Sequence, residues 1–255
     1  LVYSVRVNPG VNRAYLEGTL RKDGRLNRAT GASGLAIYRG DQFPDEYRGH
    51  AFVPESAGNV VAQFALEELE IGVSAQQQLY PDEQWGQRDF LGSTDERFRP
   101  VDAANGPDGS LYLIDMYRGI IQHGNWAREG SYLRSEILRR GLDKNIGKGR
   151  IYRLVREDIK PGPMPRFSTS DSKALVEALG HPNGWWRDEA QKLLVLRKEA
   201  KAIPLLKNAV MNAESGLARA HALWSLDGMG VWDESLVVNA ISDKDMDVRL
   251  AALRV

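Results

Sequence analysis

Lys160-Pro161-Gly162-Pro163-Met164-Pro165 divides this 255-residue chain into two sequences of different character. Each proline fixes its own φ and lacks a backbone N–H, so three prolines within five residues can continue neither a helix nor a sheet. We therefore expect a stiff linker over residues 160–166. Of the 25 glycines, 19 lie in residues 1–160 and 6 in residues 161–255. This shift is typical of turn-rich β structure followed by helix, and it predicts two domains, residues 1–159 and 167–255.

The part before the linker is predicted to consist of short strands joined by tight turns. Its β-favouring runs are bounded by Gly, Pro or Asn, and they lie at 35–38, 51–53, 60–64, 110–115, 119–122 and 149–156. Residues 33–66 and 99–124 repeat one order of strand and turn, which indicates the blades of a partial β-propeller. Between them and the linker, Leu133, Ile137 and Leu138 have helical spacing, so we expect a helical insertion over 125–148.

After the linker the apolar period becomes helical and the sequence repeats. Asp171 or Ser172 can cap a first helix, and shorter helices are expected at 202–210 and 234–241. Three longer segments align on an arginine and an alanine: Arg187 with Ala190, Arg219 with Ala222, and Arg249 with Ala252. The aligned arginines are 32 and 30 residues apart. A period near 30 residues with one small residue per helix predicts an α-solenoid of stacked helix pairs.

Charge and composition exclude several classes of function. The chain has 34 basic and 34 acidic residues, 22 of each before residue 161 and 12 of each after it. A phosphate-binding surface normally leaves a basic excess, so we expect no nucleic-acid partner. The chain has no cysteine, which excludes disulfides, thiolate metal sites and a covalently attached haem in this segment. No apolar run is long enough for a transmembrane segment, and the start at Leu1 inside a strand-like sequence indicates a fragment.

The densest polar constellation before the linker comprises Asp115, Tyr117, Arg118 and His123, at the end of an apolar strand. Asp115 either binds a metal or orients an arginine, or it caps the turn through a hydrogen bond to the backbone. Arg99 stands at a strand entrance with Asp102, where an ion pair and a contact to substrate are the two alternatives.

Motifs for metal or nucleotide chemistry are missing from the sequence. There is no H-E-x-x-H spacing, so no histidine metal site is predicted, and the turn at 102–109 lacks the distal Glu of an EF-hand. No P-loop, G-x-G-x-x-G or G-x-S-x-G occurs. The basic run from 134 to 156 is interpreted as a solvated insertion or as one side of salt bridges.

Several longer motifs carry a family resemblance. They are Asn8-Pro9-Gly10-Val11-Asn12-Arg13, Ile37-Tyr38-Arg39-Gly40-Asp41-Gln42-Phe43-Pro44, Phe52-Val53-Pro54-Glu55-Ser56-Ala57-Gly58-Asn59, Phe90-Leu91-Gly92-Ser93-Thr94-Asp95-Glu96-Arg97-Phe98-Arg99-Pro100, residues 105–119, residues 181–188 and residues 217–224. Across nearly the whole chain, the sequence resembles the membrane-bound dehydrogenases of planctomycetes and related bacteria. These are similar to glucose/sorbosone dehydrogenase β-propellers.

The resemblance implies a periplasmic or exported oxidoreductase with the C-terminal blades of a propeller followed by a HEAT-like α-solenoid. In the related sugar dehydrogenases, pyrroloquinoline quinone (PQQ) and calcium serve the propeller, and a histidine base takes the substrate proton. The early blades that carry this base, and the c-type cytochrome domain that receives the electrons, are expected outside this chain as its partners. No catalytic residue can therefore be assigned here. Five candidates remain for contacts to substrate or cofactor: Arg39, Arg99, Asp115, Arg118 and His123.

Two hypotheses follow from the sequence. In the first, this chain is part of a quinoprotein-type sugar or alcohol dehydrogenase that passes electrons to haem c, and alone it is inactive. In the second, propeller and solenoid form a non-catalytic scaffold that binds carbohydrate or, through the solenoid, a protein partner.

Overall fold

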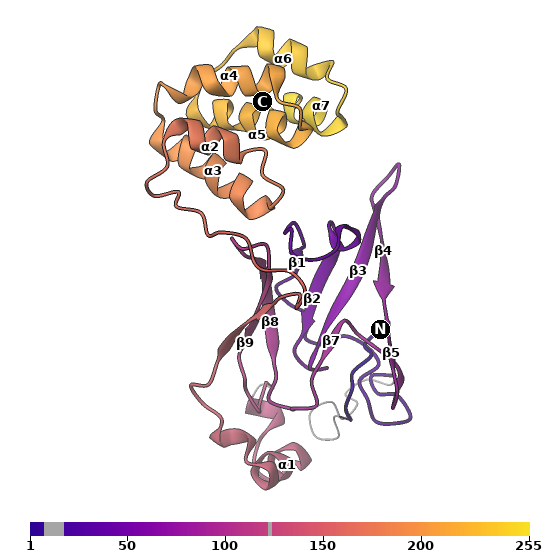
Figure 1. Ribbon diagram of the computed structural model, residues 1–255. Coiled ribbons are helices and arrows are strands. Elements are labelled where there is room, and N and C mark those ends of the chain that lie inside the picture. The colour runs from indigo at the N-terminus through magenta and orange to yellow at the C-terminus, as the bar shows by residue number, and fades with distance from the viewer. Residues whose placement is uncertain (8–17, 122–123) are drawn as a thin grey trace. The chain divides into compact units, whose positions relative to one another are not determined.

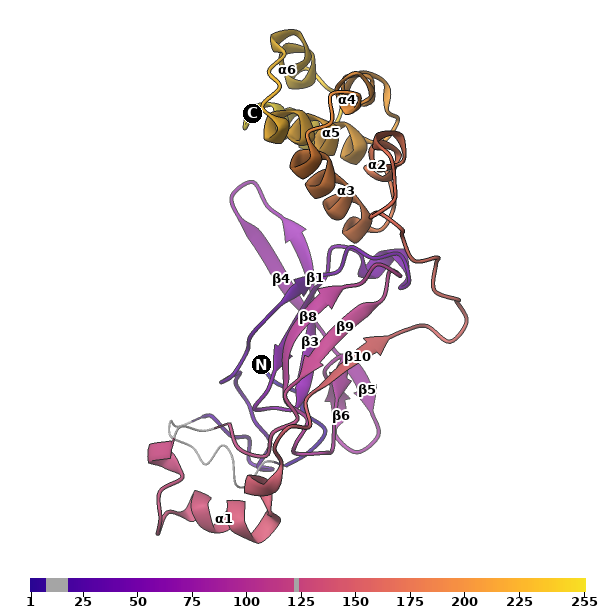
Figure 2. The same ribbon diagram turned by 90° about the vertical axis from the view of Figure 1, so that its left-hand side faces the viewer.

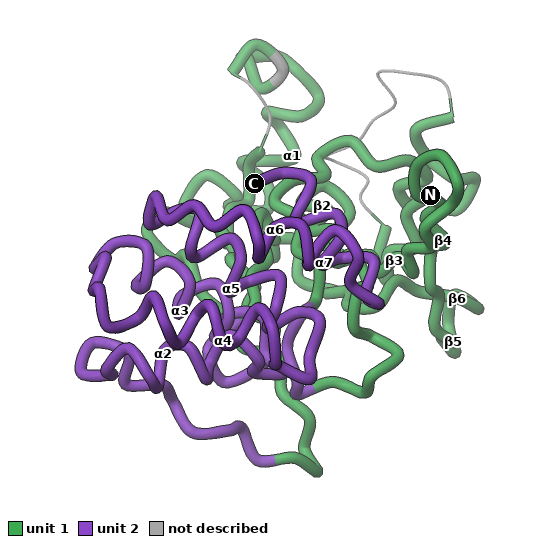
Figure 3. Tube along the Cα trace, turned by 90° about the horizontal axis from the view of Figure 1, so that it is seen from above, with its two compact units in different colours: residues 1–38, 43–105, 110–159 green, residues 39–42, 106–109, 160–255 purple. Residues whose placement is uncertain are grey.

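The computed structural model describes residues 1–7, 18–121 and 124–255, and they form a multidomain β + α protein. The chain divides into two compact units, shown in different colours in Figure 3. Unit 1 comprises residues 1–38, 43–105 and 110–159; unit 2 comprises residues 39–42, 106–109 and 160–255. The candidate His123 lies outside the described residues.

The larger sheet of unit 1 is an antiparallel meander in which sequential strands are neighbours (Figure 1). Its strands are β1 (Ala36–Ile37), β2 (Ala51–Glu55), β3 (Val60–Glu68) and β4 (Val73–Gln78), and β7 (Leu91–Gly92) also pairs with β3. The turn between β2 and β3 comprises residues 56–59, where Asn59 takes φ 59°. Residues 66–73, at the tip of the β3–β4 ribbon, are exposed.

A second sheet, in the order β10-β9-β8, faces the viewer in Figure 2. It contains β8 (Pro100–Asn105), β9 (Leu111–Asp115) and β10 (Arg150–Leu154), while β5 (Tyr80–Asp82) pairs with β6 (Gly86–Arg88) in a separate hairpin. Phe52 and Val61 of the larger sheet, with Tyr38 directly after β1, share one buried core with Leu111 and Leu113 of β9. The sheets described in unit 1 are antiparallel, and none closes on itself.

The segment between β9 and β10 contains a helix and two 3₁₀ turns. Helix α1 (Tyr132–Arg140) begins at the N-cap Ser131 and ends at Gly141, whose φ of 61° suits glycine. The 3₁₀ turns are η2 (Gly124–Trp126) and η3 (Leu142–Lys144). The strand predicted at 119–122 is wrong over its described residues 119–121. There Gly119 runs so close to η3 that a Cβ would lie 2.4 Å from the carbonyl oxygen of Leu142, which leaves no room for a paired strand.

Unit 2 contains six α-helices arranged as three successive pairs. They are α2 (Ser172–Ala178), α3 (Gly184–Arg197), α4 (Ala202–Asn212), α5 (Gly216–Met229), α6 (Glu234–Ile241) and α7 (Met246–Ala252). The predicted helices at 202–210 and 234–241, and the predicted cap Asp171, are confirmed. Helix α5 packs between α3 and α7, and α4 packs between α2 and α6. Leu175, Leu194, Leu206, Leu226 and Val248 belong to one continuous core through all three pairs.

Candidate functional site

Arg99 is fully buried, and its guanidinium is bound by the backbone of its own unit. Nη1 donates to the carbonyl oxygen of Ser56 at 2.8 Å and Nε to that of Arg118 at 3.0 Å, while Nη2 lies 3.4 Å from that of Gly119. Burial lowers the pKa of Arg99 to about 10, so the group remains charged at neutral pH. The side chain thus ties together three chain segments, and neither the predicted ion pair with Asp102 nor an open contact surface is found.

Asp115, the last residue of β9, is 1% exposed and caps the turn that follows it. Its Oδ1 accepts the backbone N–H groups of Arg99 and Tyr117, each at 2.7 Å. Its Oδ2 is buried without a hydrogen-bond partner among the described residues. Of the three predicted roles of Asp115, the turn cap is the one that these hydrogen bonds show.

The structure brings three of the five candidates together. Arg118 is half-buried, and its carbonyl receives the Nε–H of Arg99, so Arg99, Asp115 and Arg118 form one cluster. Arg39 belongs instead to unit 2, where it forms a bidentate ion pair with Asp188 at 2.7 and 2.9 Å. The carbonyl of Arg39 also accepts the N–H of Gly184 at the start of α3. Gly184 fits there because a Cβ would lie within 2.8 Å of the Arg39 side chain.

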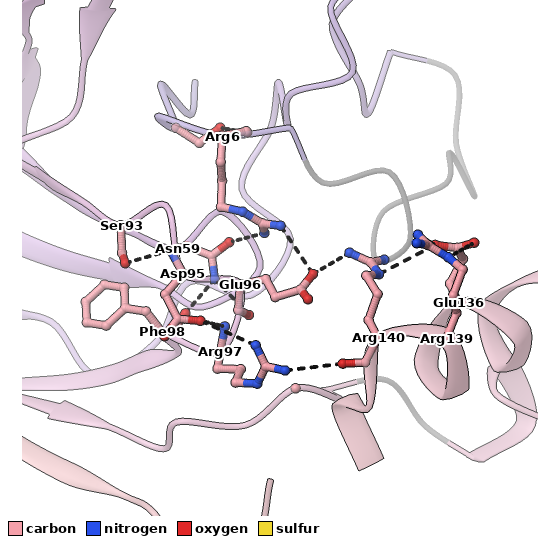
Figure 4. A network of polar contacts seen from close by, with 12 residues as sticks. Arg6, Asn59, Ser93, Asp95, Glu96, Arg97, Phe98, Glu136, Arg139 and Arg140 are labelled. Atoms are coloured by element: carbon pink, nitrogen blue, oxygen red, sulfur yellow. Dashed lines mark hydrogen bonds and ion pairs between the residues drawn. The ribbon is translucent and has the colours of Figure 1, made fainter. Parts of the chain in front are cut away.

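A second polar network, which the sequence analysis missed, joins the N-terminal segment to α1 (Figure 4). The Arg6 guanidinium donates to Asn59 Oδ1 at 2.9 Å and to Glu96 Oε2 at 3.3 Å, and Arg140 donates to the same oxygen of Glu96. Burial lowers the pKa of Arg6, although Glu96 opposes this shift. Two arginines on one half-buried carboxylate hold chain segments together, and the only sequence signal was the basic run that contains Arg140.

A third polar group lies beside the aromatic core of unit 1. The Tyr80 hydroxyl donates to Gln63 Oε1 at 2.5 Å, and Gln63 Nε2 lies 2.7 Å from His50 Nδ1. The Tyr47 hydroxyl lies 3.2 Å from that of Tyr80. Burial and the neighbouring Tyr47 raise the pKa of Tyr80, so this phenol stays protonated and acts as a hydrogen-bond donor. No motif linked these residues in the sequence, because they come from separate segments: Gln63 lies in β3, His50 directly before β2 and Tyr80 in β5.

In unit 2 the three aligned arginines make the same contact. Each donates Nη1 to the carbonyls of the residues six and five positions before it, in the turn that precedes its helix. Arg219 also uses Nε and Nη2, which donate to the two carboxylate oxygens of Asp243 at 2.8 Å each. Asp243 lies in the turn of the next helix pair, between α6 and α7, and this contact lowers its pKa. Arg219 therefore links two successive pairs.

The described residues do not fit the cofactors that the resemblance implies. Among them no group of three His, Asp or Glu side chains could hold a metal ion such as calcium. In the Arg99–Asp115 cluster, the guanidinium and one carboxylate oxygen already bind backbone groups, so neither is available to a quinone. Within the described parts of the chain, no helix has both the length and the apolar character needed to cross a membrane.

Comparison with known proteins gives one match. Residues 3–158 match DUF7133, which is described as a domain of unknown function. No curated protein and no solved structure matches the chain.

Proposed function

The chain belongs to the DUF7133 domain family, and we propose that it acts as a protein-binding scaffold, with the stacked helix pairs of unit 2 as its binding surface. The packing of α3 on α5 and of α5 on α7 carries this proposal. In stacked-helix proteins the faces of the helix pairs serve as extended binding surfaces. The core that runs through all three pairs makes this unit a rigid support.

We also propose the finer fold classes predicted above. The meander β1-β2-β3-β4 has the strand number and the neighbour order of a propeller blade, which supports a partial β-propeller. The repeated arginine contacts and the packing of α3 on α5 and of α5 on α7 support a HEAT-like α-solenoid.

The test compares the full chain with two variants in capture from cell extract, followed by binding measurements on the purified partner. Leu196→Asp places a charge on α3 of unit 2, where Leu196 is 70% exposed, and Ile71→Asp places one at the tip of the β3–β4 ribbon, where Ile71 is 93% exposed. We expect a purified partner to bind the unchanged chain and the Ile71→Asp control alike, and at least tenfold more weakly to Leu196→Asp. If no purified protein distinguishes the two variants, the scaffold proposal is wrong.

The dehydrogenase implied by the resemblance stays a prediction, as do its periplasmic location, its carbohydrate substrate and its cytochrome partner. Its test is reduction of a redox dye by sugars after PQQ and calcium are added to the intact protein, because this chain alone is expected to be inactive under both hypotheses. Dye reduction that depends on PQQ would favour the enzyme, whereas the scaffold proposal expects none.

A further inference from the structure

We propose that the groove between α2 and α4 binds an extended peptide segment of a partner protein, one that carries an aliphatic or methionine side chain and a lysine or arginine. This inference rests on the proposed function. It names the part of unit 2 that binds and the chemistry of the segment that is bound.

The groove lies along the first two helix pairs, where α2 and α4 are neighbours (Figure 1). Its volume is about 510 Å³, which is within the range of ligand sites in proteins. Its apolar lining includes Val176 and four residues with no side chain or only a methyl group, Gly180, Ala209, Ala213 and Ala218. These short residues leave room for a side chain that comes from a partner.

In the next junction of the stack, between α4 and α6, long side chains of the chain itself connect the two helices. Lys207 of α4 donates through Nζ to Asp233, the N-cap of α6, at 2.7 Å. Met211 of α4 lies with its Sδ 4.0 Å from Asn239 Nδ2 of α6. One ammonium group and one unbranched apolar side chain thus bridge this junction.

Helix α2 lacks such side chains toward α4. The buried Leu175 of α2 corresponds to the buried leucine of α4 that follows it by 31 residues. The same offset places Val176 at the position of Lys207 and Gly180 at that of Met211. Val176 is too short to bridge the junction and Gly180 has no side chain, so the place that the chain fills between α4 and α6 is open between α2 and α4.

Two amides of α4 can bind the backbone of an extended chain in this groove. Asn208 and Asn212 are exposed and line the groove, and Asn212 Nδ2 donates to Asn208 Oδ1 at 2.8 Å. Among the described residues, Asn208 Nδ2 and Asn212 Oδ1 have no hydrogen-bond partner, so one offers a donor and the other an acceptor.

The spacing of these amides fits an extended chain rather than a helix. Four residues of an α-helix advance about 6 Å. An extended chain presents N–H and C=O groups on one edge at every second residue, about 6.8 Å apart. A helical partner has no use for the two amides, because its own hydrogen bonds occupy its backbone groups. In an extended chain alternate side chains point in opposite directions, so those on one side enter the hollow at Gly180.

The charges at the groove favour a basic residue in the bound segment. Lys173 and Glu177 of α2 lie 3.9 Å apart and pair with each other. Glu214, in the turn between α4 and α5, is exposed, and it has no ion pair in the described part of the chain. The net charge of these three groups is negative, so a lysine or arginine beside Glu214 would complete the pairing.

The first test fills the groove. Gly180→Met places there the side chain that α4 carries at Met211. A Cβ on Gly180 would lie 3.6 Å from Ala218 Cβ, an ordinary van der Waals contact, and Gly180 lacks the positive φ that requires glycine, so the variant should fold. Gly162→Met is the matched control: it adds the same side chain in the linker, where no described atom lies within 4 Å of a Cβ.

The probe is a library of random heptapeptides displayed on phage and selected on the full chain. The selected peptides are synthesised with capped ends, and their binding is measured by fluorescence anisotropy. We expect them to share an aliphatic residue or methionine and a lysine or arginine. They should bind the Gly162→Met control like the unchanged chain, and Gly180→Met at least tenfold more weakly.

Further substitutions test how the peptide is held. Asn208→Ala should weaken binding about fivefold, whereas Asn239→Ala, which removes an exposed amide of α6, should leave it unchanged. Methylation of the peptide nitrogens in turn should find one position at which the loss is about fivefold with the unchanged chain and smaller with Asn212→Ala. Glu214→Gln should weaken binding about threefold, and only for peptides that keep their basic residue.

Three results would overturn the inference: no peptide is selected, the selected peptides bind Gly180→Met and Gly162→Met alike, or circular dichroism shows that the bound peptide is helical. A captured protein that is sensitive to Leu196→Asp but not to Gly180→Met would refute this inference and leave the scaffold proposal standing. Peptides that bind the groove, without any captured protein that distinguishes Leu196→Asp from Ile71→Asp, would support the groove and refute the scaffold proposal.

Discussion

Arg99 illustrates how a charged side chain can serve the fold of a sheet unit. Its three donating atoms satisfy the carbonyls of residues 56, 118 and 119, which belong to two segments far apart in the sequence. Asp115 holds the backbone N–H of Arg99 on the other side, so the two residues fix the entrance of β8 against the end of β9. A buried cation of this kind stabilises the fold only while its carbonyl partners remain in place.

We predict that Arg99→Met destabilises the protein by about 3 kcal/mol, because it leaves buried carbonyls without donors. Urea unfolding followed by the signal of the sheet unit measures the change. Arg48→Met is the control: Arg48 is exposed and its ion pair with Asp45 lies at the surface, so we expect a change below about 0.5 kcal/mol. An equal effect of both substitutions would contradict the structural role of Arg99.

The sequence identified the repeated arginines of unit 2, but it did not predict the contacts that they make. The aligned arginines at 187, 219 and 249 were recognised from their spacing, and the structure gives all three the same contact. Their role could not be predicted, because the accepting carbonyls belong to turns whose geometry no residue type encodes. The same holds for Arg6 and Glu96, which are 90 residues apart and meet only in the folded chain.

At the scale of elements, close approach of helices depends on single glycines. Gly228 of α5 lies against Val195 of α3, and a Cβ at Gly228 would come within 2.7 Å of Val195 Cγ2. Alanine is favoured over glycine inside a helix by about 1 kcal/mol. The contact with Val195 opposes this gain in stability, because the branched side chain of Val195 has few other rotamers on a packed helix.

We therefore predict that Gly228→Ala lowers the stability of unit 2 by about 1 kcal/mol despite its better helix propensity. In a Val195→Ala background the collision is absent, and the same change should raise stability by up to about 1 kcal/mol. Thermal unfolding followed by circular dichroism at 222 nm measures both. If Gly228→Ala has the same sign in the two backgrounds, packing between α3 and α5 does not decide the outcome.

Elements with a local signal were predicted, and elements with a tertiary cause were not. The helices of unit 2 have periodic apolar residues and N-caps, so their limits agree closely with the sequence. In the outer half of the β3–β4 ribbon, buried and exposed residues do not alternate. The register of β4 is set by its pairing with β3 alone. The strand expected at 119–122 failed over its described residues because Gly119 packs on Leu142.

At the scale of the whole molecule, unit 2 includes two short segments that the amino-acid composition does not assign to it. Residues 39–42 and 106–109 cluster with the helices. Within this unit Arg39 pairs with Asp188, and the Trp186 indole donates to the carbonyl of Pro107 at 2.7 Å. Such contacts join residues about 80 to 150 positions apart, and a reading based on local pattern cannot find them.

The stability of the molecule should also depend on pH through His221, a buried histidine of α5. Its Nδ1 lies 2.6 Å from Gln191 Oε1 on α3. Burial, aided by the positive charges of Arg187 and Arg39, lowers its pKa from the ordinary value of 6.5 to about 4, against the opposing charge of Asp188. The folded protein thus holds a neutral imidazole at pH values where the unfolded chain binds a proton.

We predict that this histidine contributes no pH dependence above pH 6.5, where both states are neutral. As the pH falls from 6.5 to 4 the unfolded state gains a proton first, so stability should decrease by at most about 3 kcal/mol and then level off below pH 4. Urea unfolding at pH 7 and pH 4.5 measures the change for the unchanged chain and for His221→Gln. Carboxylates and His181 titrate in both proteins, so the difference between the two pH dependences isolates His221. The variant should lose less stability on acidification, and identical losses in both proteins would show that the α3–α5 interface accepts the protonated ring.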